Sequence, residues 1–390
     1  MNLSFKPQKS SLILTLFLLI LSVISLFIGV LDLDIKTLLQ GHPEAWHIFL
    51  VSRLPRLLAL LCTGAGMSVA GLIMQQLCMN KFVSPSTGAT LSSAQMGILF
   101  ALIFCPNFGL WGRALCSFAF AIAGTWIFVA FIQRVQFKST AMVPLVGIMF
   151  GNVIGGVTSY FAFRFELNQA LSSFLVGSFS GVVRGRYELV YIALPLIILA
   201  YLYSNHFNIV GMGKDFSKNL GVSYQLILFG GLTLAAVITA AIVAVVGSIS
   251  YIGLIVPNTV SMFKGDRIRS NLLDTALFGC LFVVACDILA RIIIPPYELP
   301  IGLISGILGS LIFAVFLIFR LKGRRPSFKL SPRLMATTSP CSDALAKALS
   351  SAHTPQPTNS TTSSASATSS NLLTDQSRMS SESDTIGEEQ

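Results

Sequence analysis

The sequence carries little charge. Only 16 of its 390 residues are acidic and 26 are lysine or arginine, so charged residues make up 11% of the chain, whereas soluble domains carry about a quarter. Hydrophobic residues make up 54%, and the mean hydropathy is +0.77. This scarcity of charge excludes an ordinary soluble domain and predicts a polytopic membrane protein.

The motifs that mark catalysis are also missing. The sequence holds no GxxxxGK[ST] phosphate loop, no HExxH and no GxSxG. Its four histidines are scattered, and its seven cysteines form no CxxC pair. Most of these cysteines lie in apolar runs, where cysteine packs as a small hydrophobe. The sequence therefore predicts a chain that is not an enzyme and that holds no metal or other cofactor.

The net charge of +10 does not require a nucleic acid partner. The basic residues lie mostly between apolar runs, and the loops on one side of the expected topology hold about twice as many as those on the other. By the positive-inside rule, this bias predicts that the N-terminus and the C-terminus are both cytoplasmic. We therefore expect a membrane environment and no nucleic acid.

Long apolar runs divide the chain into segments that can span a bilayer, which takes about 20 residues each. The segment 251–263 is too short alone and contains Pro257, so we expect it to be part of a broken helix. The expected fold class is all-α, with about ten transmembrane helices including this short broken one. The ten segments are 11–31, 54–79, 86–106, 113–133, 141–163, 187–205, 225–249, 251–263, 271–294 and 299–319.

The composition changes near Pro326. Residues 1–325 form the expected transmembrane domain, whereas residues 326–390 are rich in serine and threonine and end in acidic residues. Such a segment cannot bury enough apolar surface to fold. We therefore expect residues 326–390 to be a disordered cytoplasmic tail, either regulatory or without function.

Acidic residues in or near apolar segments are candidates for proton or ion coupling in secondary transporters. Here they are Asp274, Asp287 and Glu298. Asp287 and Arg291 are spaced i, i+4, so they can also form a neutralised pair along one helix face. The sequence alone leaves both interpretations open.

Two further stretches stand out. The helix that begins at SRLPR places Arg53 and Arg56 on the outer side, although arginine is costly near hydrocarbon. On the inner side, two glycines precede KDFSKNL, in which Phe216 and Leu220 share one helical face. This stretch is either a plain loop or a short helix that docks on a soluble partner.

Five segments in the same order resemble the iron-chelate (FecCD-type) permease family. They are SRLPRLLALL, GAGMSVAGLIMQQLCMNKFVSPST, FLVGSFSG, VGSISYIGLIVPNTVSMFKGD and DILARIIIPPYELPIGLISGILGS. The resemblance covers roughly residues 10–320 and is closer to the siderophore permeases than to the cobalamin branch. It implies the fold of the cobalamin importer permease, with ten helices per subunit.

The resemblance also implies a function and partners. The chain would be the permease subunit of an ATP-driven importer that moves ferric siderophore across the bacterial inner membrane. Its partners would be cytoplasmic ATP-binding subunits, a periplasmic or surface substrate-binding protein, and a second permease subunit, identical or homologous. Three alternatives remain: the same fold importing cobalamin or haem, a proton-coupled secondary transporter that uses Asp287, and a membrane sensor that uses the tail.

Site residues follow by the same resemblance. The arginines of the RLPR segment are expected to meet acidic residues of the binding protein, with a third arginine from DILAR. The expected docking residues are Arg53, Arg56 and Arg291. The residues expected to couple to the ATPase are Gly211, Gly213, Lys214, Asp215, Phe216, Leu220 and Gly221.

The family's cytoplasmic gates correspond to the loops after the second and fourth segments. The expected gate residues are Asn80, Phe82, Ser139 and Thr140. The first of these loops departs from the common family pattern, because Lys81 stands where proline is usual. The gate is therefore expected to differ in detail from that of most members.

Overall fold

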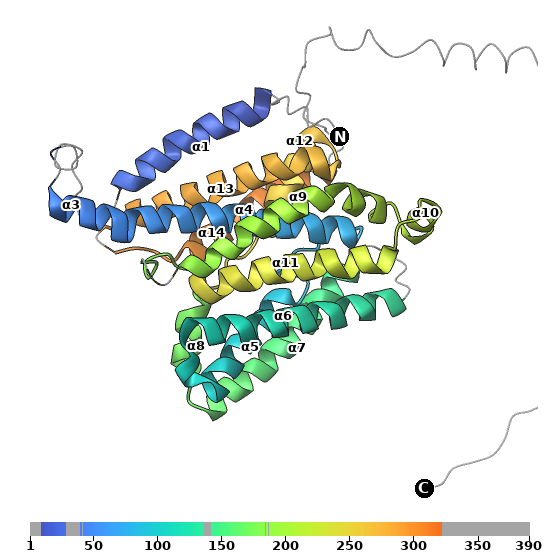
Figure 1. The fold of residues 1–390 in the computed structure, drawn as a ribbon, viewed down its shortest axis with the longest axis horizontal. Helices are drawn as coiled ribbons and strands as arrows, with labels where there is room; N and C mark the ends of the chain where they lie inside the picture. Colours follow the sequence, from blue (N-terminus) through green and yellow to red (C-terminus); the bar gives the residue numbers. More distant parts are fainter. Residues whose placement is uncertain are drawn as a thin grey trace, which may run out of the picture. The chain divides into compact units, whose positions relative to one another are not determined.

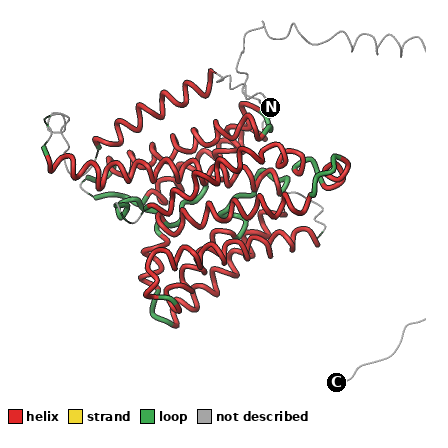
Figure 2. Tube along the Cα trace, viewed as in Figure 1, coloured by secondary structure: helices red, strands yellow, loops and turns green. Residues whose placement is uncertain are grey.

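The computed structural model describes residues 9–28, 40, 42–135, 142–183, 185, 187–295 and 297–321. These residues form helices and loops, with one isolated backbone bridge between Val176 and Ser248, and Figure 2 shows no strand among them. The expected all-α class is confirmed. The tail, residues 326–390, lies outside the described residues, so the boundary near residue 325 stays a prediction.

Figure 1 shows the helices of the described residues. They are α1 (Lys9–Phe27), α3 (Pro43–Ile48), η1 (Phe49–Arg53), α4 (Leu54–Leu77), α5 (Thr90–Phe104), η2 (Pro106–Phe108), α6 (Gly109–Arg134), α7 (Met142–Arg164), α8 (Asn168–Leu175), η3 (Glu188–Ile192), α9 (Ala193–Val210), α10 (Lys214–Asn219), α11 (Tyr224–Val246), α12 (Ile252–Lys264), α13 (Ile268–Ile292) and α14 (Ile301–Leu321).

Each of the ten apolar segments contains a helix. Six helical stretches among the described residues are long and apolar enough to cross a membrane: Pro43–Leu77, Gly109–Arg134, Met142–Arg164, Glu188–Val210, Tyr224–Val246 and Ile268–Ile292. Three shorter stretches are also apolar: Ser11–Phe27, Thr90–Phe104 and Ile301–Val315. The chain is therefore a polytopic membrane protein, while the count of ten spans stays a prediction.

Helix α4 is the centre of the bundle. It packs against α13, α11, α12 and α9 (Figure 1), and most of its side chains are buried. The approach to α12 is so close that a Cβ on Gly71 would lie 1.9 Å from the carbonyl oxygen of Gly253. Only glycine fits at residue 71, because any side chain would collide with the backbone of α12. Helices α5 and α6 pack against α11, and α7 packs against α5.

The short segment 251–263 forms a helix, but it is not broken at Pro257. Helix α12 continues from Ile252 to Lys264 with Pro257 inside it, so the expected break at that residue is wrong. The interruption lies earlier, at 247–251, between α11 and α12.

A glutamine from another helix explains why α12 tolerates this proline. Pro257 has no N–H, so the carbonyl of Gly253, one turn earlier, loses its usual donor. The side-chain amide of Gln75 in α4 donates to the carbonyl oxygens of Gly253 (3.3 Å) and Leu254 (3.2 Å) instead. The backbone group that proline leaves open is thereby satisfied inside the membrane domain.

The long helices give the bundle two ends. One end, here called the α3 end, holds α3, the start of α4 and the end of α13. The opposite end, here called the α10 end, holds α10, the end of α4 and the start of α11. Helix α1 lies against α13 along its length and exposes most of its large apolar side chains.

Candidate functional site

The predicted arginines meet at the α3 end around two carboxylates. Arg56 donates to Asp287 through Nη2 (2.7 Å) and to both carboxylate oxygens of Glu298 through Nη1 (2.9 Å each). Arg291, one helical turn after Asp287, pairs with the second oxygen of the same carboxylate. The pairing expected from the i, i+4 spacing is confirmed. These residues together with Arg53 are called the arginine cluster below.

The arginine cluster is buried and connects distant parts of the chain. The side chain of Asp287 is 0% exposed and that of Arg56 is 11% exposed. Arg53 donates to the carbonyl of Ile28 (2.8 Å), and Arg291 donates to the same carbonyl. Charges this deep are tolerated in a membrane helix because they are paired and hydrogen-bonded. Three guanidinium groups face two carboxylates, so the cluster keeps one net positive charge.

The cluster also holds the end of α1. Arg291 donates to the carbonyl oxygen of Ser25 (3.0 Å) and to its hydroxyl oxygen (2.6 Å). At the other end of α1, the hydroxyl of Ser11 donates to Asp274 (2.7 Å), which also pairs with Lys264. Polar contacts therefore fix both ends of an otherwise apolar helix.

The predicted coupling segment is a short helix at the α10 end. Helix α10 is preceded by Gly213 (φ +111°) and followed by Gly221 (φ +71°). Both backbone conformations strain a residue with a side chain, which explains a glycine at each end. Phe216 is 42% exposed and Leu220 is 55% exposed. The expected short helix with an apolar face is confirmed; its contact with an ATPase stays a prediction.

The other predicted coupling residues frame this helix. Lys214 and Asp215 are exposed in its first turn. Gly211 directly follows α9 and packs against the side chain of Gln76. A Cβ on residue 211 would lie 2.2 Å from the side-chain nitrogen of Gln76. The buried Ser217, which sequence reasoning missed, donates to the carbonyl of Ile209 (3.2 Å) and ties α10 back to α9.

The described half of the predicted gate lies between α4 and α14. The side-chain oxygen of Asn80 accepts from the backbone N–H of Phe82 (2.9 Å), which shapes the turn after α4. The ring of Phe82 meets that of Phe313 edge to face, with centroids 6.2 Å apart. Ser139 and Thr140 lie outside the described residues. The structure brings Asn80 and Phe82 together, and their gating role stays a prediction.

Contacts from α12 and from the loop that follows it hold this turn in place. The side-chain amide of Asn258 donates to the carbonyl of Lys81 (2.8 Å), and the ammonium of Lys81 pairs with Asp266 (2.7 Å). Sequence reasoning missed Asn258 and Gln75. An uncharged polar residue inside an apolar helix, and an asparagine beside an intrahelical proline, are the signals that could have found them. The described residues include no group of three or more potential metal ligands.

A family model decides what kind of chain this is. The model described as the FecCD transport family matches residues 17–319, which include α10, the turn after α4 and the arginine cluster. The chain belongs to the FecCD transport family. The resemblance stated from the sequence motifs is therefore confirmed.

Relatives and a solved structure agree with this assignment. The FecCD chain is similar to the petrobactin import system permease protein YclN of Bacillus subtilis (strain 168), with 44% identity over 79% of this chain and 97% of that protein. It is also similar to the ferric-anguibactin transport system permease protein FatD of Vibrio anguillarum, with 36% identity over 75% and 94%.

A solved structure described as an inward-facing conformation of a metal-chelate type ABC transporter matches with a TM-score of 0.67 and 26% identity, over 80% of this chain and 98% of that one. The FecCD chain is thus a polytopic ABC transporter permease, and it is not itself catalytic.

Proposed function

We propose that this chain is the permease subunit of an ATP-driven importer that moves a ferric siderophore across the bacterial inner membrane. The single observation that carries the proposal is the 44% identity to YclN over 97% of that protein, because its name describes a petrobactin import permease. In this arrangement the α10 end faces the cytoplasm, together with both termini. The α3 end faces the periplasm or the cell exterior.

ATP hydrolysis is assigned to separate subunits that dock on α10. The chain has no phosphate loop of its own, and α10 presents Phe216 and Leu220 to solvent at one end of the bundle. A small exposed apolar face on a short helix suits the groove of a soluble partner. Nucleotide-driven movement of that partner would shift α10 and alternate the access of the pathway.

Docking of the substrate-binding protein is assigned to the α3 end. The arginine cluster keeps one net positive charge, and the side chain of Glu298 is 20% exposed. An acidic side chain of the partner can replace Glu298 on the outer side of Arg56 by a charge-assisted hydrogen bond. A second permease subunit, identical or homologous, would complete the pathway.

The geometry favours ATP-driven import over proton coupling. Asp287 accepts hydrogen bonds from Arg56 and Arg291 and is shielded from solvent. A carboxylate held between two guanidinium groups is a fixed counter-ion, whereas a proton carrier needs access to water.

Uptake of radiolabelled iron tests the proposal. Cells that lack this chain would be supplied with catecholate, hydroxamate and haem iron, and with labelled cobalamin, with the partner ATPase active or inactivated. We expect loss of one ferric siderophore alone, restored by the chain only when the ATPase is active. Loss of cobalamin or haem uptake instead would assign that compound as the cargo. Uptake that survives without the ATPase would contradict the mechanism, and no uptake defect would favour a sensor.

A further inference from the structure

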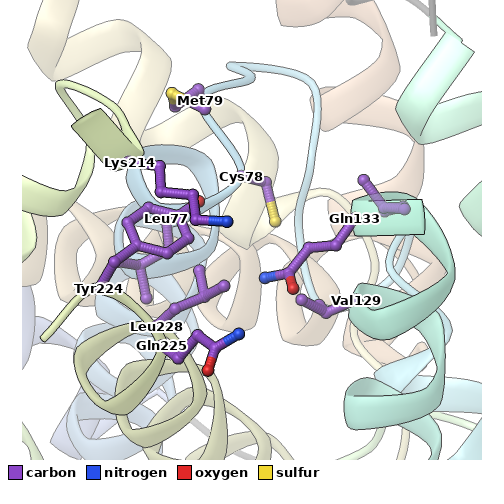
Figure 3. A pocket seen from close by; sticks show the side chains of 10 residues that line it. Leu77, Cys78, Met79, Val129, Gln133, Lys214, Tyr224, Gln225 and Leu228 are labelled. Carbon is purple, nitrogen blue, oxygen red and sulfur yellow. The ribbon is translucent and has the colours of Figure 1, made fainter. Parts of the chain in front are cut away.

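A cavity of about 320 Å³ lies at the α10 end, between the end of α4, the last turn of α6, the start of α10 and the start of α11. Its polar lining includes Lys214, Gln133 and Gln225. Figure 3 shows the Lys214 ammonium and the two side-chain amides pointing into one space from different sides. These groups can all donate hydrogen bonds to the same ligand.

These three side-chain donors have no hydrogen-bond acceptor among the described residues. The side chains of Lys214, Gln133 and Gln225 form no hydrogen bond or ion pair with any described side chain or backbone group. None of the ten residues that line the cavity is acidic. The Cys78 thiol also lines the cavity. The electrostatic character of the cavity is therefore positive, which suits an anion.

The rest of the lining is apolar and belongs to membrane-spanning helices. Leu77 from α4, Val129 and Ile132 from α6 and Leu228 from α11 form this part of the wall. Leu226, next to Gln225, is 69% exposed, so an apolar surface adjoins the cavity. The cavity therefore combines a group of hydrogen-bond donors and one positive charge with an apolar wall.

We infer that this cavity binds the headgroup of an anionic phospholipid from the leaflet at the α10 end, with its phosphate on Lys214, Gln133 and Gln225. Basic pockets between membrane helices bind lipid headgroups in this way. A soluble anion would satisfy the three donors but would leave the apolar wall unused. The volume is at the lower end of the range for ligand pockets and fits a glycerophosphate group.

Lipid binding to the purified, delipidated full-length chain in detergent tests the inference. Native mass spectrometry would compare phosphatidylglycerol with phosphatidylcholine of identical acyl chains. We expect the anionic lipid to bind preferentially and Lys214→Gln to weaken it about tenfold, because one charge-assisted contact to phosphate is lost. Gln133→Leu, which keeps the charge and removes a donor, should weaken binding about threefold.

The matched control is Lys218→Gln. Lys218 lies on the same short helix and is exposed, but it does not line the cavity. The control removes the same charge, so non-specific attraction to anionic lipid would fall equally in both variants. We expect less than a twofold change for Lys218→Gln, with unchanged melting temperatures for all three variants.

Three results would overturn the inference. Equal effects of Lys214→Gln and Lys218→Gln, with no effect of Gln133→Leu, would show that only surface charge matters. Inorganic phosphate or glycerol 3-phosphate that binds as tightly as the lipid would assign the cavity to a soluble anion. An acidic peptide that displaces the lipid at equal concentration would assign it to a protein partner.

Discussion

At the scale of single residues, the arginine cluster shows how charged side chains at the end of a membrane helix can be stabilised by partners inside the protein. Arg53 and Arg56 look costly at the start of an apolar helix, yet their cost is offset inside the protein by Asp287, Glu298 and a backbone carbonyl. The same contacts limit what a binding protein can reach, because the accessible part of the cluster is the side of Arg56 that holds Glu298.

Removing the central carboxylate should therefore destabilise the chain strongly. Asp287→Ala leaves Arg291 buried without a counter-ion, which costs about 3–5 kcal/mol in comparable buried pairs. Glu298→Ala still leaves Arg56 paired with Asp287, and Glu298 is partly exposed, so this substitution should cost clearly less. Melting temperatures in detergent, measured on both variants, check the difference. Equal melting temperatures would show that the buried carboxylate is not needed to hold the arginines.

At the scale of helices, the sequence predicts where apolar segments lie but not which polar groups pair between them. Each of the ten segments is a local property of about 20 residues, and a helix was found in each. The partners of Arg56 lie 231 and 242 residues away, and Gln75 lies 178 residues from Gly253. No local pattern contains such pairings. The break expected at Pro257 was wrong because the distant amide of Gln75 satisfies the carbonyl that proline leaves without a donor.

The exchange between Gln75 and Pro257 can be measured as a double-mutant cycle. Gln75→Leu should destabilise the chain by about 1–3 kcal/mol, because the carbonyl of Gly253 loses its donor. Adding Pro257→Ala returns a backbone N–H to that carbonyl and should recover most of the loss. Pro257→Ala alone should change little. Additive effects in thermal unfolding would refute this compensation.

Helix α10 should matter for transport without mattering for stability. Phe216→Ala removes an exposed side chain, so the free energy of unfolding should change by less than about 0.5 kcal/mol. ATP-dependent uptake should fall several-fold, because the partner loses an apolar contact. The matched control is Phe263→Ala, an exposed phenylalanine near the end of α12. Similar uptake in the two variants would argue against docking on α10.

At the scale of the whole molecule, we predict that the part of the chain that matches the family folds and works without the part that does not. The family match ends at residue 319, and the low-complexity stretch follows. A chain ended after Arg325 should therefore melt at the same temperature and import at the same rate as the full chain. Uptake and thermal unfolding of the two forms, expressed side by side, check this. A lower melting temperature would show that the tail contributes to the fold.

The way α1 is fastened has a consequence for biosynthesis. Its two ends bind Asp274 and Arg291, which follow Ser11 and Ser25 in the chain by 263 and 266 residues. At a translation rate of about 5–20 residues per second, the first helix leaves the ribosome roughly 13–50 s before these partners exist. For most of that interval α1 is held only by lipid and by its contacts with the start of α4, such as the hydrogen bond from Arg53 to the carbonyl of Ile28. The uncharged run from Ser11 onward therefore allows α1 to stay in the membrane as part of an assembly intermediate until α13 has been made.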